Sequence, residues 1–405
     1  MESTRRPRLT PEIADIRRAI RTALADAGLG SAVTPSGPAA PLSDPVLPDS
    51  ALPDAALPDS GASHRRPLVL VGLSGGPDSL ALAAGTAFEA PRAGLRAGAV
   101  IVDHALQPGS ADVAAEAALQ ATALGLDPVL VVRITVDHGE NRRGSAADTD
   151  PDTDPAERYS GPEAAARTGR YAAFVRALAD TGATHILLGH TLDDQAETVL
   201  LGLARGSGPV SLHGMLRVSG AYLRPLLGIR RTQTVAACTD SGLTPWTDPH
   251  NAEHRFARVR VRETVLPVLE RELGPGVAEA LARTADLLRE DEEALRERTL
   301  ELAEACFEAA TDGIRVPVAA LAAQPAALRN RLIRLAAARA AVPRAPGTGA
   351  FVVLALPRGA TLAVGRLVTD WHGQAPLDLP GVRVVRHDGW LVFTAAAALM
   401  TRTAN

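Results

Sequence analysis

The sequence predicts an α/β protein: a doubly wound parallel sheet followed by a C-terminal helical region and a terminal β-hairpin. Three observations support this fold class. Short apolar runs alternate with helical patterns as far as about residue 260, which is typical of a parallel sheet covered by helices on both faces. Long patterns rich in alanine, leucine, arginine and glutamate then predict helices to about residue 341. Two alternating runs around a turn follow and predict a hairpin.

Each expected strand is a short apolar run. The four runs cover residues 67–73, 98–102, 128–136 and 184–188. A helical pattern follows each run, and these patterns begin after Asp78, Ser110, Pro162 and Leu192. Because ligands of doubly wound sheets bind beyond the carboxyl ends of the strands, we expect the functional residues just after these runs.

We expect three parts in the chain, over residues 1–64, 65–256 and 257–405. In the first part, residues 10–27 have the N-cap, first-turn proline and apolar spacing of an amphipathic helix. Residues 30–63 are rich in Pro, Ala, Ser and Asp, cannot bury a core, and are interpreted as a disordered linker. The second part is the expected catalytic domain and carries an acidic insert over residues 140–159, interpreted as a solvated loop. The third part is the helical region with the hairpin, whose turn is His387-Asp388-Gly389.

The composition excludes several classes of protein. The 405 residues contain no lysine, so all 42 basic residues are arginine and no Walker-type Gly-Lys-Ser/Thr loop can exist. The two cysteines, Cys238 and Cys306, cannot build a zinc ribbon or a CxxC redox pair. No run of about eighteen apolar residues and no apolar signal core occurs, so we expect a soluble cytoplasmic protein that does not enter a membrane.

The first motif is a glycine-rich turn between a strand and a helix. The first apolar run leads into the turn Ser74-Gly75-Gly76-Pro77-Asp78-Ser79, and a helical pattern begins directly after it. In such a turn, successive backbone N–H groups and the start of the helix can surround an anion. Asp78 would repel a bare phosphate, so we expect it to act through Mg²⁺. The string resembles the PP-loop of the ATP pyrophosphatase families, and this resemblance implies cleavage of ATP to AMP and pyrophosphate.

Acids and histidines follow two further expected strands. Asp103-His104 comes after the second run, and the string His190-Thr191-Leu192-Asp193-Asp194-Gln195-Ala196-Glu197 comes after the fourth. Residues three or four apart share a helix face, which brings Asp194 and Glu197 together at the edge of the sheet. Clustered carboxylates beside ATP can hold Mg²⁺ or a substrate ammonium group. A helix cap is the alternative interpretation of both strings.

Arginine is concentrated in two places. Arg167 and Arg170 share a helical pattern with Glu163, which indicates either a phosphate contact or a surface ion-pair face. Further arginines follow the acidic string, namely Arg205, Arg217, Arg224, Arg230, Arg231, Arg255, Arg258, Arg260 and Arg262. Their concentration suits contact with RNA phosphates, and scattered surface arginine is the alternative.

These motifs occur in the order that is found in the tRNA(Ile)-lysidine synthetase family, and the resemblance runs from about Leu68 to Pro267. It implies that free L-lysine is joined to C2 of the wobble cytidine in the CAU anticodon of tRNA(Ile), through an adenylated intermediate and with ATP and Mg²⁺. The sequence departs from the family pattern at Thr191, where a second histidine is usual. It also departs at Val259, where many relatives have asparagine.

The resemblance also implies roles for individual residues. The expected catalytic residues are Asp78, Asp194, Glu197 and Arg167, with Asp194 or Glu197 holding or deprotonating lysine. The expected nucleotide site comprises Ser74, Gly75, Gly76, Pro77, Asp78, Ser79, Asp103, His104 and His190. Asp78 and Asp193 are the expected metal ligands. The expected RNA contacts are Arg205, Arg224, Arg255, Arg258, Arg260 and Arg262.

Two other functions agree with parts of the sequence. A tRNA thiolase would share the PP-loop, but the best-known thiolases use catalytic or cluster-binding cysteines, and the cysteines here are isolated. A non-catalytic RNA-binding protein would not need Asp78, Asp194 and Glu197 together. ATP–pyrophosphate exchange and the mass of the product distinguish the three functions. The sequence leaves the oligomeric state open, with a homodimer as one alternative.

Overall fold

The computed structural model describes residues 9–30, 66–105, 109–134, 162–206, 208, 212–246, 253–341 and 356–396. Apart from Gly30, the predicted linker over residues 30–63 and the acidic insert over residues 140–159 lie outside these ranges. The chain divides into two compact units, the first ending at Arg289 and the second beginning at Glu290. The expected boundaries after residues 64 and 256 stay predictions. No helix within the described ranges is long and apolar enough to cross a membrane.

A mostly parallel sheet forms the centre of the first unit. Its strands are β1 (Leu68–Gly72), β2 (Arg96–Asp103), β3 (Val129–Arg133), β4 (His185–Leu188), β5 (Val218–Ser219) and β6 (Tyr222–Leu223). Among the described residues, five α-helices precede β5 in the chain, namely α1 (Pro11–Asp26), α2 (Pro77–Glu89), α3 (Ser110–Ala123), α4 (Pro162–Thr181) and α5 (Leu192–Ala204). The later ones are α7 (Arg231–Asp240), α8 (Ala257–Arg260) and α9 (Leu266–Leu273). Short 3-10 helices lie at Pro91–Ala93 and Pro225–Gly228, and a short π-helix lies at Val261–Val265. The four predicted strands and the helices after them are therefore confirmed.

The order of the strands creates a switch point. Within the described residues the order is β3-β2-β1-β4-β6-β5. Strand β1 pairs in parallel with β2 on one side and with β4 on the other, and β5 at the edge is antiparallel to β6. The chain runs from β1 outward to β2 and β3, and then returns to β4 on the opposite side of β1. Ligands of doubly wound sheets bind where the order reverses in this way, which here is between β1 and β4.

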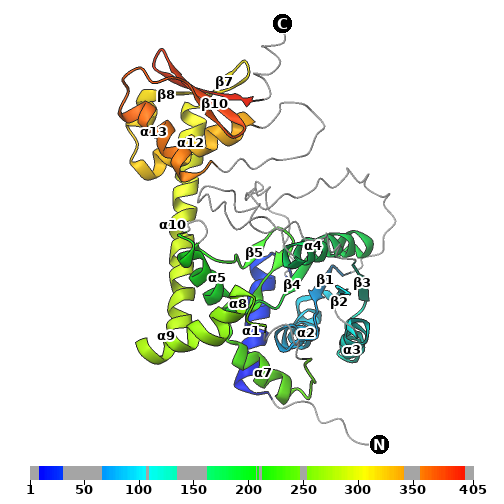
Figure 1. Ribbon diagram of the computed structural model, residues 1–405. Helices are drawn as coiled ribbons and strands as arrows, with labels where there is room; N and C mark the ends of the chain where they lie inside the picture. The colour runs from blue at the N-terminus through cyan, green and yellow to red at the C-terminus, as the bar shows by residue number, and fades with distance from the viewer. Residues whose placement is uncertain are drawn as a thin grey trace, which may run out of the picture. The chain divides into compact units, whose positions relative to one another are not determined.

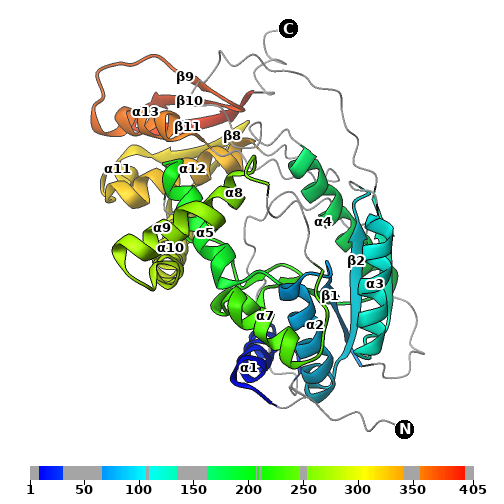
Figure 2. The same ribbon diagram turned by 60° about the horizontal axis from the view of Figure 1, so that its bottom comes forward.

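Alternate residues of β1 face two different helix layers. Val69 and Val71 belong to the core that contains α1, α2, α3 and α7, whereas Leu68 and Leu70 pack with Phe174 of α4 on the opposite face. These helices are labelled in Figure 2. Because both faces of β1 are covered, its sequence is a continuous apolar run and not an alternating one.

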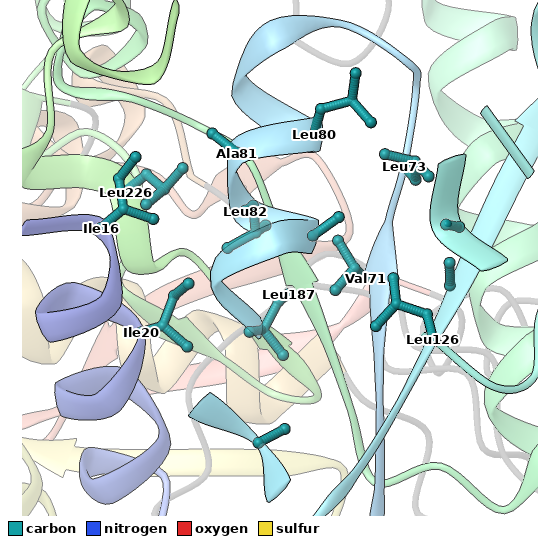
Figure 3. Close-up of a cluster of buried hydrophobic side chains, with 14 of the residues drawn as sticks. Ile16, Ile20, Val71, Leu73, Leu80, Ala81, Leu82, Leu126, Leu187 and Leu226 are labelled. Carbon is teal, nitrogen blue, oxygen red and sulfur yellow. The ribbon is translucent and has the colours of Figure 1, made fainter. Parts of the chain in front are cut away.

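Helix α1 is part of the core of this unit. Ile16 and Ile20 of α1 point toward α2, which carries Leu80 and Leu82 (Figure 3). The two helices approach closely at Gly85, where an added Cβ would lie 2.5 Å from the Ile20 Cδ1 atom. The predicted amphipathic helix is therefore confirmed, and it packs on the helix that begins at the glycine-rich turn.

The second unit combines helices with an antiparallel sheet (Figure 1). Its strands are β7 (Glu308–Ala310), β8 (Gly313–Pro317), β9 (Leu377–Leu379), β10 (Val382–His387) and β11 (Trp390–Ala395), in the order β7-β8-β11-β10-β9. Its helices are the later part of α10 (Val277–Cys306), α11 (Val318–Ala322), α12 (Ala326–Ala341) and α13 (Arg358–Thr369). The predicted hairpin is confirmed as β10–β11, with Asp388 at φ 46° and Gly389 at φ 79° in its turn. Strands β7 and β8 were not predicted, and they lie inside the expected helical region.

Candidate active site

The glycine-rich turn lies at the carboxyl end of β1 and begins α2. Gly75 has a φ of 83°, in the left-handed region that favours glycine. Gly76 is the N-cap of α2 and has no side chain that could satisfy the first N–H groups of the helix. The Ser79 hydroxyl accepts a hydrogen bond from the Ser74 N–H at 3.2 Å and donates one to the Gly76 carbonyl at 3.0 Å. The Ser79 side chain therefore stabilises the turn by hydrogen bonds within it, and the N–H groups at the start of α2 can bind an anion.

A second turn, between β4 and α5, approaches the first one closely. A Cβ added at Gly189 would lie 3.1 Å from backbone atoms of Asp78 and Ser79. Real Cβ atoms rarely come this near to a backbone, so the approach requires glycine. The acidic string that begins α5 therefore lies directly beside the glycine-rich turn, at the switch point of the sheet.

One arginine joins three acids of the site. Arg231, the first residue of α7, donates from Nε to Asp78 Oδ2 at 3.1 Å and from Nη2 to Asp194 Oδ1 at 2.8 Å. Its Nη1 lies 3.7 Å from Glu197 Oε1. Asp78 Oδ1 also accepts a hydrogen bond from the hydroxyl of Thr234, which lies one turn further along α7. The structure thus brings together the three acids that the sequence indicated and adds a cation between them.

Glu197 has no exposed surface, and guanidinium groups surround its carboxylate. Arg262 donates from Nε to Oε1 at 2.7 Å and from Nη2 to Oε2 at 3.2 Å. The Nε atom of Arg258 lies 3.6 Å from Oε2. A buried carboxylate needs such partners, since an unpaired buried charge is very costly. Two of the arginines expected at RNA therefore hold an acid of the site in this structure.

Asp194 and Asp193 use their oxygens differently. Asp194 Oδ2 accepts hydrogen bonds from the N–H and the hydroxyl of Thr191, at 2.8 and 3.0 Å, in a capping box at the start of α5. Asp193 Oδ2 accepts the Arg231 N–H at 2.7 Å, and its Oδ1 lies 3.5 Å from Arg230 Nη1. Thr191 and Asp194 therefore cap α5, and this cap leaves Asp194 Oδ1 directed to the arginines.

The environment moves the pKa values of these acids in opposite directions. Burial would raise the pKa of Asp194, but Arg231 and a backbone N–H outweigh it and hold the pKa below its usual value. Burial raises the pKa of Asp78 and that of Glu197 above their usual values, although hydrogen bonds from arginine oppose the rise. Asp194 is therefore the more strongly fixed anion, and Glu197 is the better proton acceptor.

His190 lies among cations and is neutral. Burial lowers the pKa of His190 to about 4, although the negative charge of Asp194 raises it. The guanidinium groups of Arg224, Arg258 and Arg167 lower the pKa further. Its Nδ1 atom is buried and has no hydrogen-bond partner within the described residues. The structure thus brings Arg167 near the site, with its guanidinium 5.3 Å from the ring centre of Tyr171.

The carboxyl end of β2 carries the predicted acid and histidine. Asp103 Oδ1 accepts the Ala105 N–H at 2.9 Å, in the pattern of an Asx-turn. Burial lowers the pKa of the neighbouring His104 to about 4, and Arg170, whose Nη2 lies 3.3 Å from His104 Nε2, acts in the same direction. His104 is therefore neutral, and its Nδ1 is buried without a partner within the described residues.

The six arginines that were expected to contact RNA differ in their exposure to solvent. Arg205, Arg255 and Arg260 are exposed. Arg224 is buried, and its Nη1 donates to the Leu216 carbonyl at 2.9 Å. Three of the six expected contacts are therefore exposed and Arg224 is buried. The side chains of Arg258 and Arg262, 39% and 24% exposed, pair with Glu197.

Three features of the site were not found by reasoning from the sequence: the role of Arg231, the contact of Thr234 and a cavity beside Gly75. Arg231 was grouped with the RNA-binding arginines, and Thr234 was not singled out. A cavity of about 250 Å³ adjoins Gly75, and it is lined by Trp246 and by one face of α3 that includes Val113 and Gln120. No spacing rule could have linked Arg231 with Asp78, because 153 residues separate them.

The sheet, its switch point and the turn after β1 define a PP-loop protein, and the family model described as the PP-loop domain matches residues 55–269. The tRNA(Ile)-lysidine synthase of Leifsonia xyli is 58% identical over 327 residues, which cover 80% of this chain and 89% of that relative. The one of Thermobifida fusca is 47% identical over 329 residues, which cover 81% of this chain and 92% of that relative. The chain belongs to the tRNA(Ile)-lysidine synthase family. A solved U34-tRNA thiolase of Methanococcus maripaludis has a TM-score of 0.46 at 17% identity, covering 69% of this chain and 79% of that one.

Proposed function

We propose that this chain joins free L-lysine to C2 of the wobble cytidine in the CAU anticodon of tRNA(Ile), while ATP is converted to AMP and pyrophosphate. The observation that carries the proposal is the position of Asp194 and Glu197 beside the turn from Ser74 to Ser79, in a chain that matches a tRNA(Ile)-lysidine synthase over 80% of its length. The reaction needs a phosphate site and an amine site within reach of one base. We assign the phosphate site to the turn from Ser74 to Ser79 and the amine site to the start of α5, because the two turns meet at Gly189.

In the first step, the turn from Ser74 to Ser79 holds the phosphates of ATP, and the C2 oxygen of the cytidine attacks the α-phosphorus. The bond from that phosphorus to the bridging oxygen breaks, and pyrophosphate leaves. The N–H groups at the start of α2 can stabilise the departing charge, and so can a guanidinium such as that of Arg167. Asp103, His104 and His190, at the ends of β2 and β4, are the proposed contacts of the nucleoside.

In the second step, the ε-amine of lysine attacks C2, the bond from C2 to the adenylated oxygen breaks, and AMP leaves. Asp194, whose pKa is held low, is the proposed fixed partner of the lysine ammonium. Glu197, whose pKa is raised by burial, is the proposed acceptor of the proton that the amine must lose before it attacks. The proton is thereby placed on the more basic of two neighbouring carboxylates.

Mg²⁺ is proposed to accompany ATP. Within the described residues no group of three His, Cys, Asp or Glu side chains could hold a metal ion by itself. Mg²⁺ in nucleotide sites usually takes only one or two carboxylates and draws its other ligands from phosphates and water. Asp78 fits this role, because its two oxygens accept one hydrogen bond each and keep further lone pairs free. Asp78 and Asp193 would hold the ion, which neutralises phosphate charge when it is bound.

The exposed arginines Arg205, Arg255 and Arg260 are the proposed contacts with tRNA phosphates. Arg258 and Arg262 are proposed to act mainly through Glu197. We place the enzyme in the cytoplasm because its proposed substrate is a tRNA. The division into residues 1–64, 65–256 and 257–405 is kept as the proposed domain organisation, and a homodimer is one of the oligomeric states to be tested.

The test is incubation of the protein with ATP, lysine and a tRNA that has a CAU anticodon, followed by mass analysis of the nucleosides. The expected product is cytidine in which the C2 oxygen is replaced by the ε-nitrogen of lysine. A parallel incubation with sulfide added as the sulfur donor, giving a nucleoside mass with sulfur in place of oxygen, would support a thiolase instead. Binding of tRNA without any AMP formation would support a non-catalytic RNA-binding protein. The same tRNA with a GAU anticodon is the matched control and should give no product.

A further inference from the structure

The Arg231 guanidinium occupies the centre of the acid cluster formed by Asp78, Asp194 and Glu197. Each of its nitrogens is directed to a different carboxylate, at 3.1 Å for Asp78, 2.8 Å for Asp194 and 3.7 Å for Glu197. Only 24% of the arginine side chain is exposed. The same cation thus holds Asp194, the proposed partner of the lysine ammonium, and Glu197, the proposed acceptor of its proton. In this structure Arg231, Arg258 and Arg262 together balance the charge of the three carboxylates.

A lysine ammonium that entered beside Arg231 would meet like charge. Arg262 and Arg258 already pair with Glu197, so a further cation would leave the buried cluster with an excess of positive charge. Excess buried charge is strongly unfavourable. Lysine should therefore bind well only when Arg231 gives up its contacts with Asp194 and Glu197.

Binding of ATP would displace the Arg231 side chain from these carboxylates. Asp78, which holds the Nε atom of Arg231, belongs to the turn that is proposed to bind the phosphates. Phosphates at this turn would attract the guanidinium, because arginine pairs well with phosphate oxygens. A cation that accompanies ATP to Asp78 would compete with Arg231 for the same carboxylate. Both effects draw Arg231 away from the acids of α5.

The backbone at Arg231 is anchored, so this movement involves the side chain alone. Its N–H donates to Asp193 Oδ2 at 2.7 Å at the start of α7. A rotation of the side chain can therefore transfer the guanidinium from one set of anions to another without displacing the helix.

We propose that Arg231 couples the two substrate sites: it acts as an internal counter-ion for the lysine-binding acids and is withdrawn when ATP binds, so that lysine binds tightly only after ATP. This inference rests on the proposed function, because it takes lysine as the ligand of Asp194 and Glu197. Arg231 is a positioning residue in this role. By linkage, lysine must tighten the binding of ATP by the same factor.

The test is isothermal titration of the full chain with lysine, with and without a saturating ATP analogue that has a methylene group between the α- and β-phosphorus. Wild type is expected to bind lysine about 5- to 150-fold more tightly with the analogue, which is the usual range of such coupling. In Arg231→Met, lysine should bind without nucleotide about as tightly as it binds wild type with nucleotide. The coupling factor should then fall close to one.

Arg231→Lys keeps the charge but cannot reach three carboxylates at once, so an intermediate coupling factor is expected. This variant also keeps the test valid if Arg231→Met does not fold, as judged by thermal unfolding. Arg217→Met is the matched control, because Arg217 lies 3.9 Å from Asp286 and not in the acid cluster. It should keep the wild-type coupling factor.

Two results would overturn the inference: equal lysine affinity with and without the analogue in wild type, or a coupling factor in both Arg231 variants that equals the wild-type value. Failure of the proposed function gives a different result. In that case lysine does not bind wild type under either condition, and no lysine-containing nucleoside forms.

Discussion

Arg262 holds both oxygens of the fully buried Glu197, with Nε 2.7 Å from Oε1 and Nη2 3.2 Å from Oε2. The two residues lie 65 positions apart in the chain, and the contact joins α5 to the short π-helix before α9. A bidentate arginine fixes the plane of a carboxylate as well as its position. The orientation of the proposed proton acceptor is therefore set by a residue far from it in the chain, near the end of the PP-loop domain.

Glu197→Gln is expected to weaken lysine binding by about ten- to a hundredfold, because a charge-assisted hydrogen bond is worth about 1.5 to 3 kcal/mol. It should also lower kcat, because an amide cannot accept the proton that the amine must lose. The shape of the side chain is nearly kept, so the Michaelis constant for ATP should stay close to that of wild type. Steady-state kinetics with each substrate varied in turn checks this. Glu263→Gln, at an exposed glutamate nearby, is the matched control. A rise in the Michaelis constant for ATP alone would identify the cluster as a metal site.

Asp78→Asn is expected to reduce pyrophosphate release by about a hundredfold or more, which is the usual scale when a charge that stabilises a transition state is removed. The amide keeps the size of the side chain, and the hydrogen bonds with Arg231 and Thr234 can partly persist. Pyrophosphate release is measured with tRNA and ATP, and thermal unfolding confirms that the variant is folded. Asp240→Asn, at the exposed end of α7, should leave release unchanged. Turnover near the wild-type rate in Asp78→Asn would remove this residue from the reaction.

The surface arginines are expected to affect tRNA alone. Reversing the charge of Arg255 and Arg260 together should weaken tRNA binding and lower the slope of log K against log salt by about 0.7 to 0.9 for each phosphate that the protein no longer neutralises. Affinity for ATP and lysine should not change. Arg262→Glu should instead lower the stability of the fold, measured by thermal unfolding, because it leaves the buried Glu197 carboxylate against a second acid. An unchanged salt slope in the double variant would place the RNA on another face.

The folded protein is expected to lose stability on acidification through His190. Its pKa is about 4 in the folded state, below the usual value near 6.5, so the unfolded chain takes up the proton first as the pH falls. The stabilisation is complete above about pH 6.5 and decreases toward pH 4, with a slope of up to about 1.4 kcal/mol per pH unit. The difference in unfolding free energy between wild type and His190→Asn isolates this effect from the acids of the site. A difference that does not vary between pH 4 and 7 would contradict it.

Much of the first unit follows from local patterns. The run from Leu68 to Val71 predicted a strand because both of its faces are buried, and the glycines after it predicted the turn and the start of α2. Asp194 and Glu197 were placed on one helix face by their spacing alone. These features depend on residues that lie close together in the chain. The motifs also occur along the chain in the same order as in the family.

Features that depend on distant residues were not accessible in this way. Arg231 meets Asp78 across 153 residues, and because every basic residue is arginine, its type gave no indication that it was special. Arg262 and Arg258 were assigned to RNA for the same reason. Strands β7 and β8 are short, and β8 is stabilised by pairing with β11, which lies far along the chain. Strands β7 and β8 form a hairpin in which Ala310 pairs with Gly313, and the Asp312-Gly313 turn signal was not recognised in the sequence. The pairing of β8 with β11 leaves no pattern in the local sequence.

Strand β8 has consequences for the order in which the second unit can fold on the ribosome. It lies between β7 and β11, and the fully buried Val316 and Phe393 belong to β8 and β11. The ribosome makes β8 more than 70 residues before its partner β11. Until β11 emerges, one side of β8 has no strand to pair with and its apolar face has no complete core. Nascent chains that stop before residue 390 should therefore remain sensitive to protease in this unit, although the first unit is already folded.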